Sequence, residues 1–122
     1  MNKYTSDELQ EALRPIASLI SKSEKAQQKL APGTWQHTML QANLKALHYA
    51  SALMNEDIKN LDHFTRDDLR DALLAFASMV CRTEGTHAKF SPGTSQHTLQ
   101  QNRLKALRIA EARLKLENEC TC

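Results

Sequence analysis

Residues 31–38 read APGTWQHT, and residues 91–98 read SPGTSQHT. A shift of sixty residues places one segment on the other, and the same shift aligns residues 4–54 with residues 64–114 without a gap. Close to half of the residue pairs in this alignment are identical, far more than chance would give. Such self-similarity predicts a tandem duplication in which each copy is one supersecondary unit.

The first helix of each copy is marked by a capping pattern. Thr5 and Thr65 each follow an aromatic residue and precede an acidic residue by three positions, the pattern of a helix N-cap with a capping box. Apolar residues then recur at spacings of three and four, which predicts one apolar stripe on each helix. Pro15 lies within the first stripe and Ala75 takes its place in the second, so we expect a bend in the first helix only.

The repeated Pro-Gly-Thr motif marks the turn of each helical hairpin. Pro-Gly at 32–33 and at 92–93 predicts the end of the first helix, and the threonines that follow are placed to cap the second. The second helices are expected at about 35–58 and 95–119. Their predicted core stripes are Leu44, Ala46, Leu47, Ala50 and Met54 in one copy and Leu104, Ala106, Leu107, Ala110 and Leu114 in the other.

Two hairpins joined by a short connection predict an all-α fold, an up-down-up-down four-helix bundle with both turns at the same end. We expect residues 1–122 to form a single domain that contains the internal repeat 4–54 and 64–114. The chain is expected to end in a frayed tail from about residue 117 to residue 122. Only three Gly and three Pro occur, which argues against an all-β fold with many tight turns.

Charge and composition bear on the class of function and the location. The formal net charge is +2 and is spread evenly over both halves of the chain, so no nucleic-acid partner is expected. No run of about 18 apolar residues could span a membrane, so no membrane partner is expected, and no secretory signal is visible. The three cysteines have neither a disulfide nor a zinc spacing, which favours a cytoplasmic protein. Cys81 is expected to be a small buried residue.

Polar residues interrupt the apolar stripes in the half of the predicted bundle near the turns. On a helical wheel, the positions that continue the stripes carry carboxylates, amides, imidazoles and a guanidinium. Since buried polar groups need partners, these residues are candidate ligand-binding groups. They are Glu24, Gln27, Gln36, His37, Glu84, His87, Gln96, His97 and Arg103.

Three interpretations of this polar end compete. Glu24 and Glu84 are expected to lie close together, opposite each other, with Arg103 or His87 as the counter-ion. In the first interpretation this is a splayed, hydrated bundle end, where both carboxylates form ordinary ion pairs and the histidines are half-exposed. In the second the same groups line a pocket for a ligand or partner. In the third Glu24, Glu84 and His87 hold a metal ion, with His37 or His97 as a further candidate ligand. The spacing of Glu84 and His87 matches one half of a helix-bundle metal motif, but the first copy lacks the matching histidine.

The sequence contains no glycine-rich phosphate loop, no Gly-x-Ser-x-Gly and no Cys-x-x-Cys, so no cofactor is expected. It favours a small non-catalytic interaction or regulatory module with a protein partner. A bundle that binds a ligand or metal at its polar end is the alternative, and an enzyme is the third possibility. Trp35 is replaced by Ser95 in the second copy; we expect it to pack against a helix end, with a role as an interface anchor as the alternative. A homodimer is expected because four flank residues need cover: Leu19, Met39, Met79 and Leu99.

Overall fold

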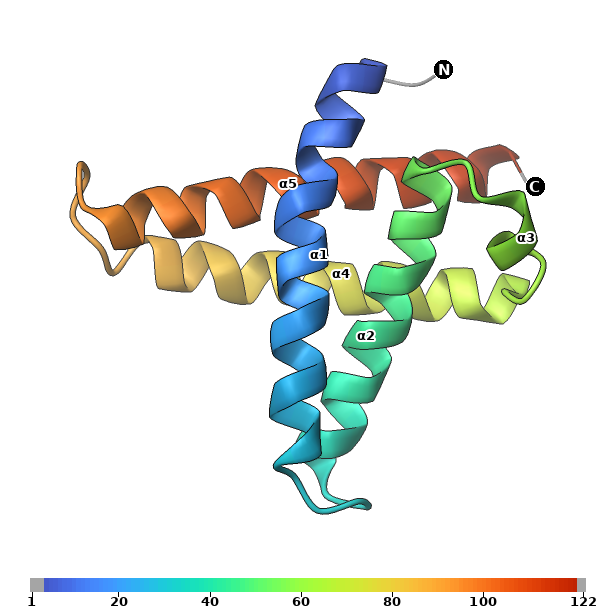
Figure 1. The fold of residues 1–122 in the computed structure, drawn as a ribbon, viewed down its shortest axis with the longest axis horizontal. Helices are drawn as coiled ribbons and strands as arrows, with labels where there is room; N and C mark the ends of the chain where they lie inside the picture. The colour runs from blue at the N-terminus through green and yellow to red at the C-terminus, as the bar shows by residue number, and fades with distance from the viewer. Residues whose placement is uncertain (1–3, 121–122) are drawn as a thin grey trace.

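The computed structural model describes residues 4–120, apart from the side chains of residues 58, 60 and 120. The protein has four long helices, α1 (Ser6–Gln28), α2 (Trp35–Met54), α4 (Arg66–His87) and α5 (Ser95–Cys120), and a short helix, α3 (Ile58–Leu61). Residues 4–120 contain no strand, and the long helices pack as a four-helix bundle (Figure 1). The predicted fold class is therefore confirmed.

Both predicted capping boxes are present. The backbone N–H of Glu8 donates to Oγ1 of Thr5 at 3.1 Å, and the N–H of Thr5 donates to Oε1 of Glu8 at 3.0 Å. In α4 the N–H of Asp68 donates to Oγ1 of Thr65 at 3.1 Å, and the N–H of Thr65 donates to Oδ2 of Asp68 at 2.8 Å. Each box satisfies backbone groups that a helix N-terminus leaves without an intrahelical partner, so the start of each hairpin is fixed.

The Pro-Gly-Thr turns have the same geometry in both hairpins. Gly33 and Gly93 both have a φ of 90°, a backbone conformation that side-chain-bearing residues avoid, which explains the glycine. Oγ1 of Thr34 and Oγ1 of Thr94 each accept a backbone N–H from three residues further on, at 3.3 and 3.1 Å. The repeated eight residues therefore form the same turn twice and cap α2 and α5.

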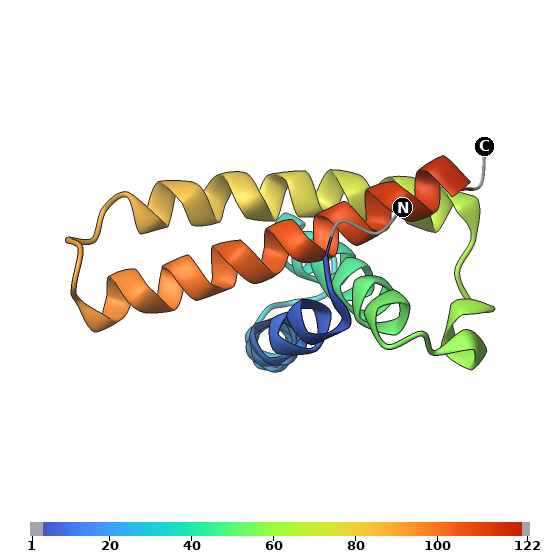
Figure 2. The ribbon, with the colours of Figure 1, turned by 90° about the horizontal axis from the view of Figure 1, so that it is seen from above.

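The two hairpins cross instead of running side by side. Figures 1 and 2 show that α1 and α2 run across α4 and α5, so the two turns lie at the tips of different arms. The prediction that both turns lie at the same end is therefore wrong. The physical reason is that buried apolar residues are confined to the half of each hairpin away from its turn, so only these halves gain free energy by packing together.

The core lies where the hairpins cross. The side chains of Ile16, Phe76 and Leu114 are fully buried there, and Leu47 and Leu107 are 1% exposed. All ten residues of the predicted α2 and α5 stripes are buried. In the partner helices the buried residues are Leu9, Ala12 and Ile16 of α1 and Leu69, Ala72 and Phe76 of α4, which occupy equivalent positions in the two copies.

Beyond the crossing, each hairpin continues as a two-helix arm. We call residues 17–42 the first arm and residues 77–102 the second arm; all of them are described, and none is buried. An isolated pair of helices covers its apolar stripes from one side only. Several apolar side chains of the arms are consequently half-exposed.

The end of α2 differs from the prediction. The helix ends at Met54, before the expected end near residue 58, because Glu56 has a left-handed φ of 56°. The N–H of Asp57 then donates to the carbonyl of Ala52 at 2.9 Å and closes the helix C-terminus. The chain reverses through α3 into α4, where Phe64 stacks on a residue of α2.

The end of α5 also differs. The helix continues to Cys120 and includes residues 117–120, where fraying was predicted, while residues 121–122 lie outside the described residues. An ion pair at 3.2 Å between Nη1 of Arg113 and Oε2 of Glu117 joins adjacent turns and supports this end. At the other end of the chain, Pro15 lies inside α1, whose first turns tilt away from the rest of the helix, whereas α4 runs straight (Figure 1).

Two predictions about single side chains on the arms are wrong. Cys81 is exposed, because the second arm has no layer of residues to cover that face. Trp35 is 69% exposed at the tip of the first arm and does not pack against a helix end. The crossing of the hairpins explains both results, since it leaves each arm without a neighbouring helix pair.

Candidate functional site

The predicted polar site is divided between the two arms. Because the turns lie at different tips, Glu24 stands on the first arm and Glu84 on the second, and these carboxylates do not face each other (Figure 1). The first arm carries Glu24, Gln27, Gln36 and His37, and the second arm carries Glu84, His87, Gln96 and His97, with Arg103 directly after it. The structure therefore forms two separate polar layers instead of one site.

The helical wheel predicted the inward side chains only in part. Gln27, His37, His87, His97 and Arg103 are half-buried, as expected of residues that continue an apolar stripe. The remaining four predicted residues, Glu24, Gln36, Glu84 and Gln96, are exposed. These four lie at the edge of the stripe, and the arms have no second helix pair to cover that edge.

The metal alternative is not supported by this placement. Glu24 is separated from Glu84 and His87 because it belongs to the other arm. The described residues contain no group of three or more His, Cys, Asp or Glu side chains arranged to hold a metal ion. The proposed set of Glu24, Glu84 and His87 is therefore corrected: the structure does not bring its members together.

Arg103 is not the counter-ion of Glu84, contrary to the prediction. Oε2 of Glu84 pairs instead with Nη2 of Arg108 at 3.0 Å, and both side chains are about half-exposed. An exposed pair of this kind contributes little to stability, because water screens both charges. Glu84 therefore belongs to the solvated surface of the second arm.

The interior of the second arm is rich in imidazole and guanidinium nitrogens. The rings of His87 and His97 meet with their centroids 4.2 Å apart and a tilt of 38°. Nε2 of His87 and Nη2 of Arg103 are buried and have no hydrogen-bond partner among the described residues. Leaving such groups without a partner costs free energy, so this layer is a weak point of the second arm.

The equivalent layer at the base of the first arm, which includes the residue directly after the arm, has no guanidinium. Gln27, His37 and Asn43 take the places of His87, His97 and Arg103, and Asn43 is the one buried polar residue of the described chain, at 8% exposure. Two amides and one imidazole thus replace two imidazoles and a guanidinium. The first arm can consequently lose contact with water at a lower electrostatic cost than the second.

The contact between α2 and α4 is closed by an ion pair. Nζ of Lys45 lies 2.7 Å from Oδ1 of Asp68, whose other oxygen holds the capping box. The hydrogen bond from Lys45, followed by that from the backbone of Thr65, lowers the pKa of Asp68 below its ordinary value. The Asp68 side chain therefore both caps the N-terminus of α4 and binds Lys45 of α2.

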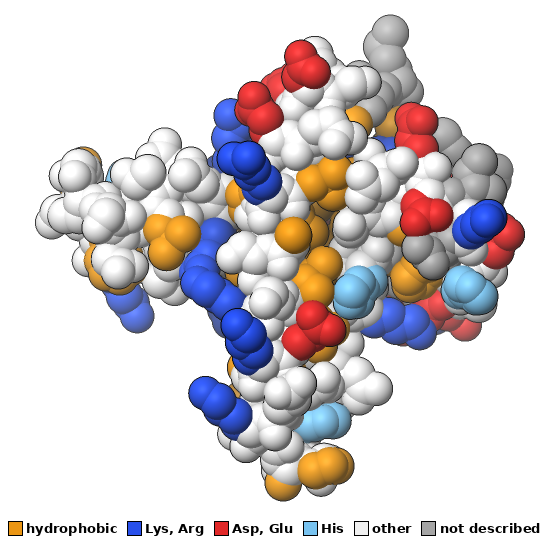
Figure 3. Space-filling view, viewed as in Figure 1, with side chains coloured by type: hydrophobic (Ala, Val, Ile, Leu, Met, Phe, Trp, Pro, Cys, Tyr) orange, Lys and Arg blue, Asp and Glu red, His pale blue; other side chains and the backbone are white. Residues whose placement is uncertain are grey.

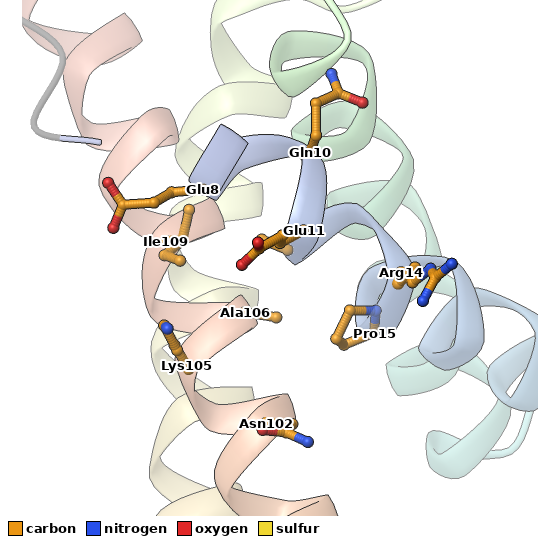
Figure 4. A pocket seen from close by; sticks show the side chains of 10 residues that line it. Glu8, Gln10, Glu11, Arg14, Pro15, Asn102, Lys105, Ala106 and Ile109 are labelled. Carbon is orange, nitrogen blue, oxygen red and sulfur yellow. The ribbon is translucent and has the colours of Figure 1, made fainter. Parts of the chain in front are cut away.

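The equivalent contact between α1 and α5 is open. Glu8 forms the capping box, and the hydrogen bonds from the backbone and side chain of Thr5, with a smaller contribution from Lys105, lower its pKa. Glu8 and Lys105 form no ion pair here, and a cleft of ≈ 560 Å³ separates the two helices (Figure 4). The cleft is lined by Glu8, Gln10, Glu11, Ala12, Arg14, Pro15, Asn102, Lys105, Ala106 and Ile109.

Sequence reasoning missed this cleft, although the repeat contains a signal for it. Pro15 and Asn102 line the cleft, and both are alanine in the other copy, at positions 75 and 42. Because these two positions carry different residues in the two copies, the α1–α5 contact can differ in shape from the α2–α4 contact.

Comparison of the chain with protein-family models, with curated proteins and with solved structures finds no match. In the part of the chain that the structure describes, no helix is both long enough and apolar enough to cross a membrane. The features on which a function can be based include the two polar layers, the uncovered apolar side chains of the arms and the α1–α5 cleft.

Proposed function

We propose that this protein is a small non-catalytic interaction module that associates with a second copy of itself through the first arm. The observation that carries the proposal is the uncovered apolar surface of that arm. Trp35 is 69% exposed at its tip, and five further apolar side chains are only half-buried. They are Leu19, Ile20, Leu30, Met39 and Leu40.

The surface of the first arm fits a helical partner. Figure 3 shows hydrophobic side chains in the seam between α1 and α2 and at the tip of the first arm. A second helix pair laid on this seam would complete locally the four-helix packing that the arm lacks. An exposed tryptophan beside such a seam is typical of an interface anchor, because it buries a large area with few rotatable bonds.

The polar layer at the base of each arm favours the first arm over the second as the self-association surface. Pairing two copies through the base of the second arm would bring two Arg103 guanidinium groups together, and their positive charges would repel. The equivalent residue at the base of the first arm is the amide Asn43. The three cysteines, which lack a disulfide spacing, support a cytoplasmic location for the module.

Light scattering over a range of protein concentrations tests the proposal. The wild type should give a mass above 13.8 kDa that rises with concentration. The double variant Trp35→Ser with Leu40→Gln introduces the residues found at the equivalent positions of the second copy, and it should stay monomeric. Leu74→Ser is the matched control, because Leu74 is 67% exposed on α4 outside both arms; this variant should associate like the wild type.

A wild type that stays at 13.8 kDa at high concentration would contradict self-association. Association that survives in the double variant would exclude the first arm as the surface. Loss of association in Leu74→Ser instead would place the interface on α4.

A further inference from the structure

The α1–α5 cleft has an apolar floor, and its two polar walls carry side chains of opposite charge. Ala12 and Pro15 of α1 and Ala106 and Ile109 of α5 supply the floor. Figure 4 shows Glu11 reaching from α1 toward α5, while Asn102 and Lys105 stand on the opposite wall. A carboxylate on one helix thus faces an ammonium group and an amide on the other.

These three polar side chains are not engaged elsewhere. Glu11, Asn102 and Lys105 are exposed, and they form no hydrogen bond or ion pair with the described residues. Glu8 differs from them, since Thr5 occupies its carboxylate in the capping box. Gln10 and Arg14 also line the cleft without a hydrogen bond or ion pair to the described residues, but Figure 4 shows their side chains pointing away from α5. The free groups that lie between the two helices are therefore the anion Glu11, the cation Lys105 and the amide Asn102.

Pro15 adds an acceptor to the α1 wall. In a regular helix the N–H of residue 15 would donate to the carbonyl of Glu11, but proline has no N–H to give. This carbonyl lies on the same face of α1 as the Glu11 side chain and the Pro15 ring, since residues four apart share a face. The α1 wall thus has a second acceptor beside the Glu11 carboxylate, and the α5 wall has the donors of Lys105 and Asn102.

We propose that the α1–α5 cleft binds a small zwitterion of the class of a short peptide with free termini. Its ammonium group pairs with Glu11, its carboxylate pairs with Lys105 and Asn102, and an aliphatic side chain rests on the apolar floor. A ligand of single charge would form a charge-assisted contact with only one of Glu11 and Lys105, whereas a zwitterion forms one with each. The volume of ≈ 560 Å³ lies within the range of small-molecule pockets, about 300–1,000 Å³.

The other copy explains why the cleft takes a ligand and the α2–α4 contact does not. There the cation Lys45 is already paired with Asp68, and alanine occupies the positions of Pro15 and Asn102. In the cleft, the charge of Lys105 is available to a ligand. In the α2–α4 contact, the charge of the equivalent Lys45 is neutralised by Asp68. The cleft lies outside the first arm, so the proposed self-association and this binding site are tested separately.

Isothermal titration calorimetry with the dipeptides Ala-Leu, Leu-Leu and Val-Ala tests the proposal on the full chain. At least one of them should bind, and both its N-acetylated form and its C-terminal amide should bind about tenfold more weakly or worse, since each lacks one charge-assisted contact. No binding by any of the three dipeptides, or equal binding by the blocked forms, would overturn the proposal.

Two variants assign the contacts. Glu11→Gln and Lys105→Met should each weaken binding of the free dipeptide about tenfold, with thermal unfolding unchanged because both side chains are exposed. Glu11→Gln should leave binding of the N-acetylated form unaffected, since that form has no ammonium group. The matched controls are Asp71→Asn, at the equivalent position of α4, and Lys22→Met, an exposed lysine outside the cleft; both should bind like the wild type. Equal loss in the controls would show that net charge, not the cleft, governs binding.

Discussion

The α2–α4 contact and the α1–α5 contact both join the two hairpins, and they involve equivalent positions of the two copies. An ion pair bridges the α2–α4 contact, whereas a cleft lies in the α1–α5 contact. In the α2–α4 contact Lys45 reaches Asp68 at 2.7 Å. In the α1–α5 contact the equivalent Lys105 has no ion-pair partner among the described residues, and the helices border a cleft. The core residues beneath both contacts are buried to the same degree.

This difference shows that a shared core does not fix the surface of a contact. Seven of the ten positions that line the cleft differ between the copies, and three of these differences are Asp68 to Glu8, Ala75 to Pro15, and Ala42 to Asn102. None of these three cleft residues is buried, so they lie where packing constraints are weakest. Two hairpins of similar sequence can therefore have the same fold while their contacts differ in shape.

The largest effect is expected from truncation of the shared core. Leu47→Ala and Leu107→Ala should each lower the free energy of unfolding by about 2–5 kcal/mol, because both side chains are buried in equivalent places. Leu40→Ala, on the half-exposed first arm, should cost clearly less. Urea denaturation measures all three. If only one of the two core variants lost much of its free energy of unfolding, the two contacts would not share one core, and the comparison between them would fail.

Exchange of the residues at positions 15 and 75 sharpens the comparison directly. Ala75→Pro should destabilise the protein by about 3 kcal/mol or more, because it removes a backbone hydrogen bond from the straight helix α4. Pro15→Ala should stabilise it by a smaller amount, since the structure around α1 already accommodates the proline. Thermal unfolding tests both. If α4 tolerated the proline without loss, the bend in α1 would have another cause.

Loss of a helix cap should have a smaller effect. Thr65→Ala and Thr5→Ala should each cost about 1 kcal/mol through the lost cap. Thr65→Ala should be the more costly of the two, because the same box positions Asp68 for its bond to Lys45. Chemical denaturation of both variants gives the order, and a greater loss in Thr5→Ala would show that the ion pair does not depend on the cap.

The stability that the Lys45–Asp68 ion pair gives to the α2–α4 contact should depend on pH. The pKa of Asp68 is lowered in the folded state, chiefly by the hydrogen bond from Lys45, so its carboxylate stabilises the fold above the unfolded-state pKa, near pH 4. This contribution should fade as the pH falls through the lower folded-state pKa. Asp68→Asn should be less stable than the wild type at pH 7 and should differ less at about pH 2. A constant difference across this range would exclude ionisation as the cause.

The smallest effect is expected outside both contacts. Glu84→Gln removes the exposed pair with Arg108 and should change the free energy of unfolding by about 0.5 kcal/mol or less. Urea denaturation at low and at high salt measures it. A loss of several kcal/mol would show that the second arm depends on this carboxylate.

The sequence by itself determined the helices, their caps and their turns, because these depend on residues close together in the chain. Thr5 and Thr65 marked two helix starts, and the Pro-Gly-Thr motifs marked two equal turns. The periodicity of the second helices also identified the core, since every residue of both predicted stripes is buried. Local patterns were less reliable for the helix ends, since they did not reveal the left-handed backbone conformation of Glu56 that ends α2 at Met54.

Only the tertiary structure decided how the hairpins meet. Periodicity shows which face of a helix is apolar but not the angle at which two such faces pack, since this angle depends on side-chain shapes from distant parts of the chain. The predicted site with Glu24 opposite Glu84 required parallel hairpins, and the crossing placed the two carboxylates on different arms. The α1–α5 cleft arises for the same reason, because Glu11, Pro15, Asn102 and Lys105 become neighbours only where the hairpins cross.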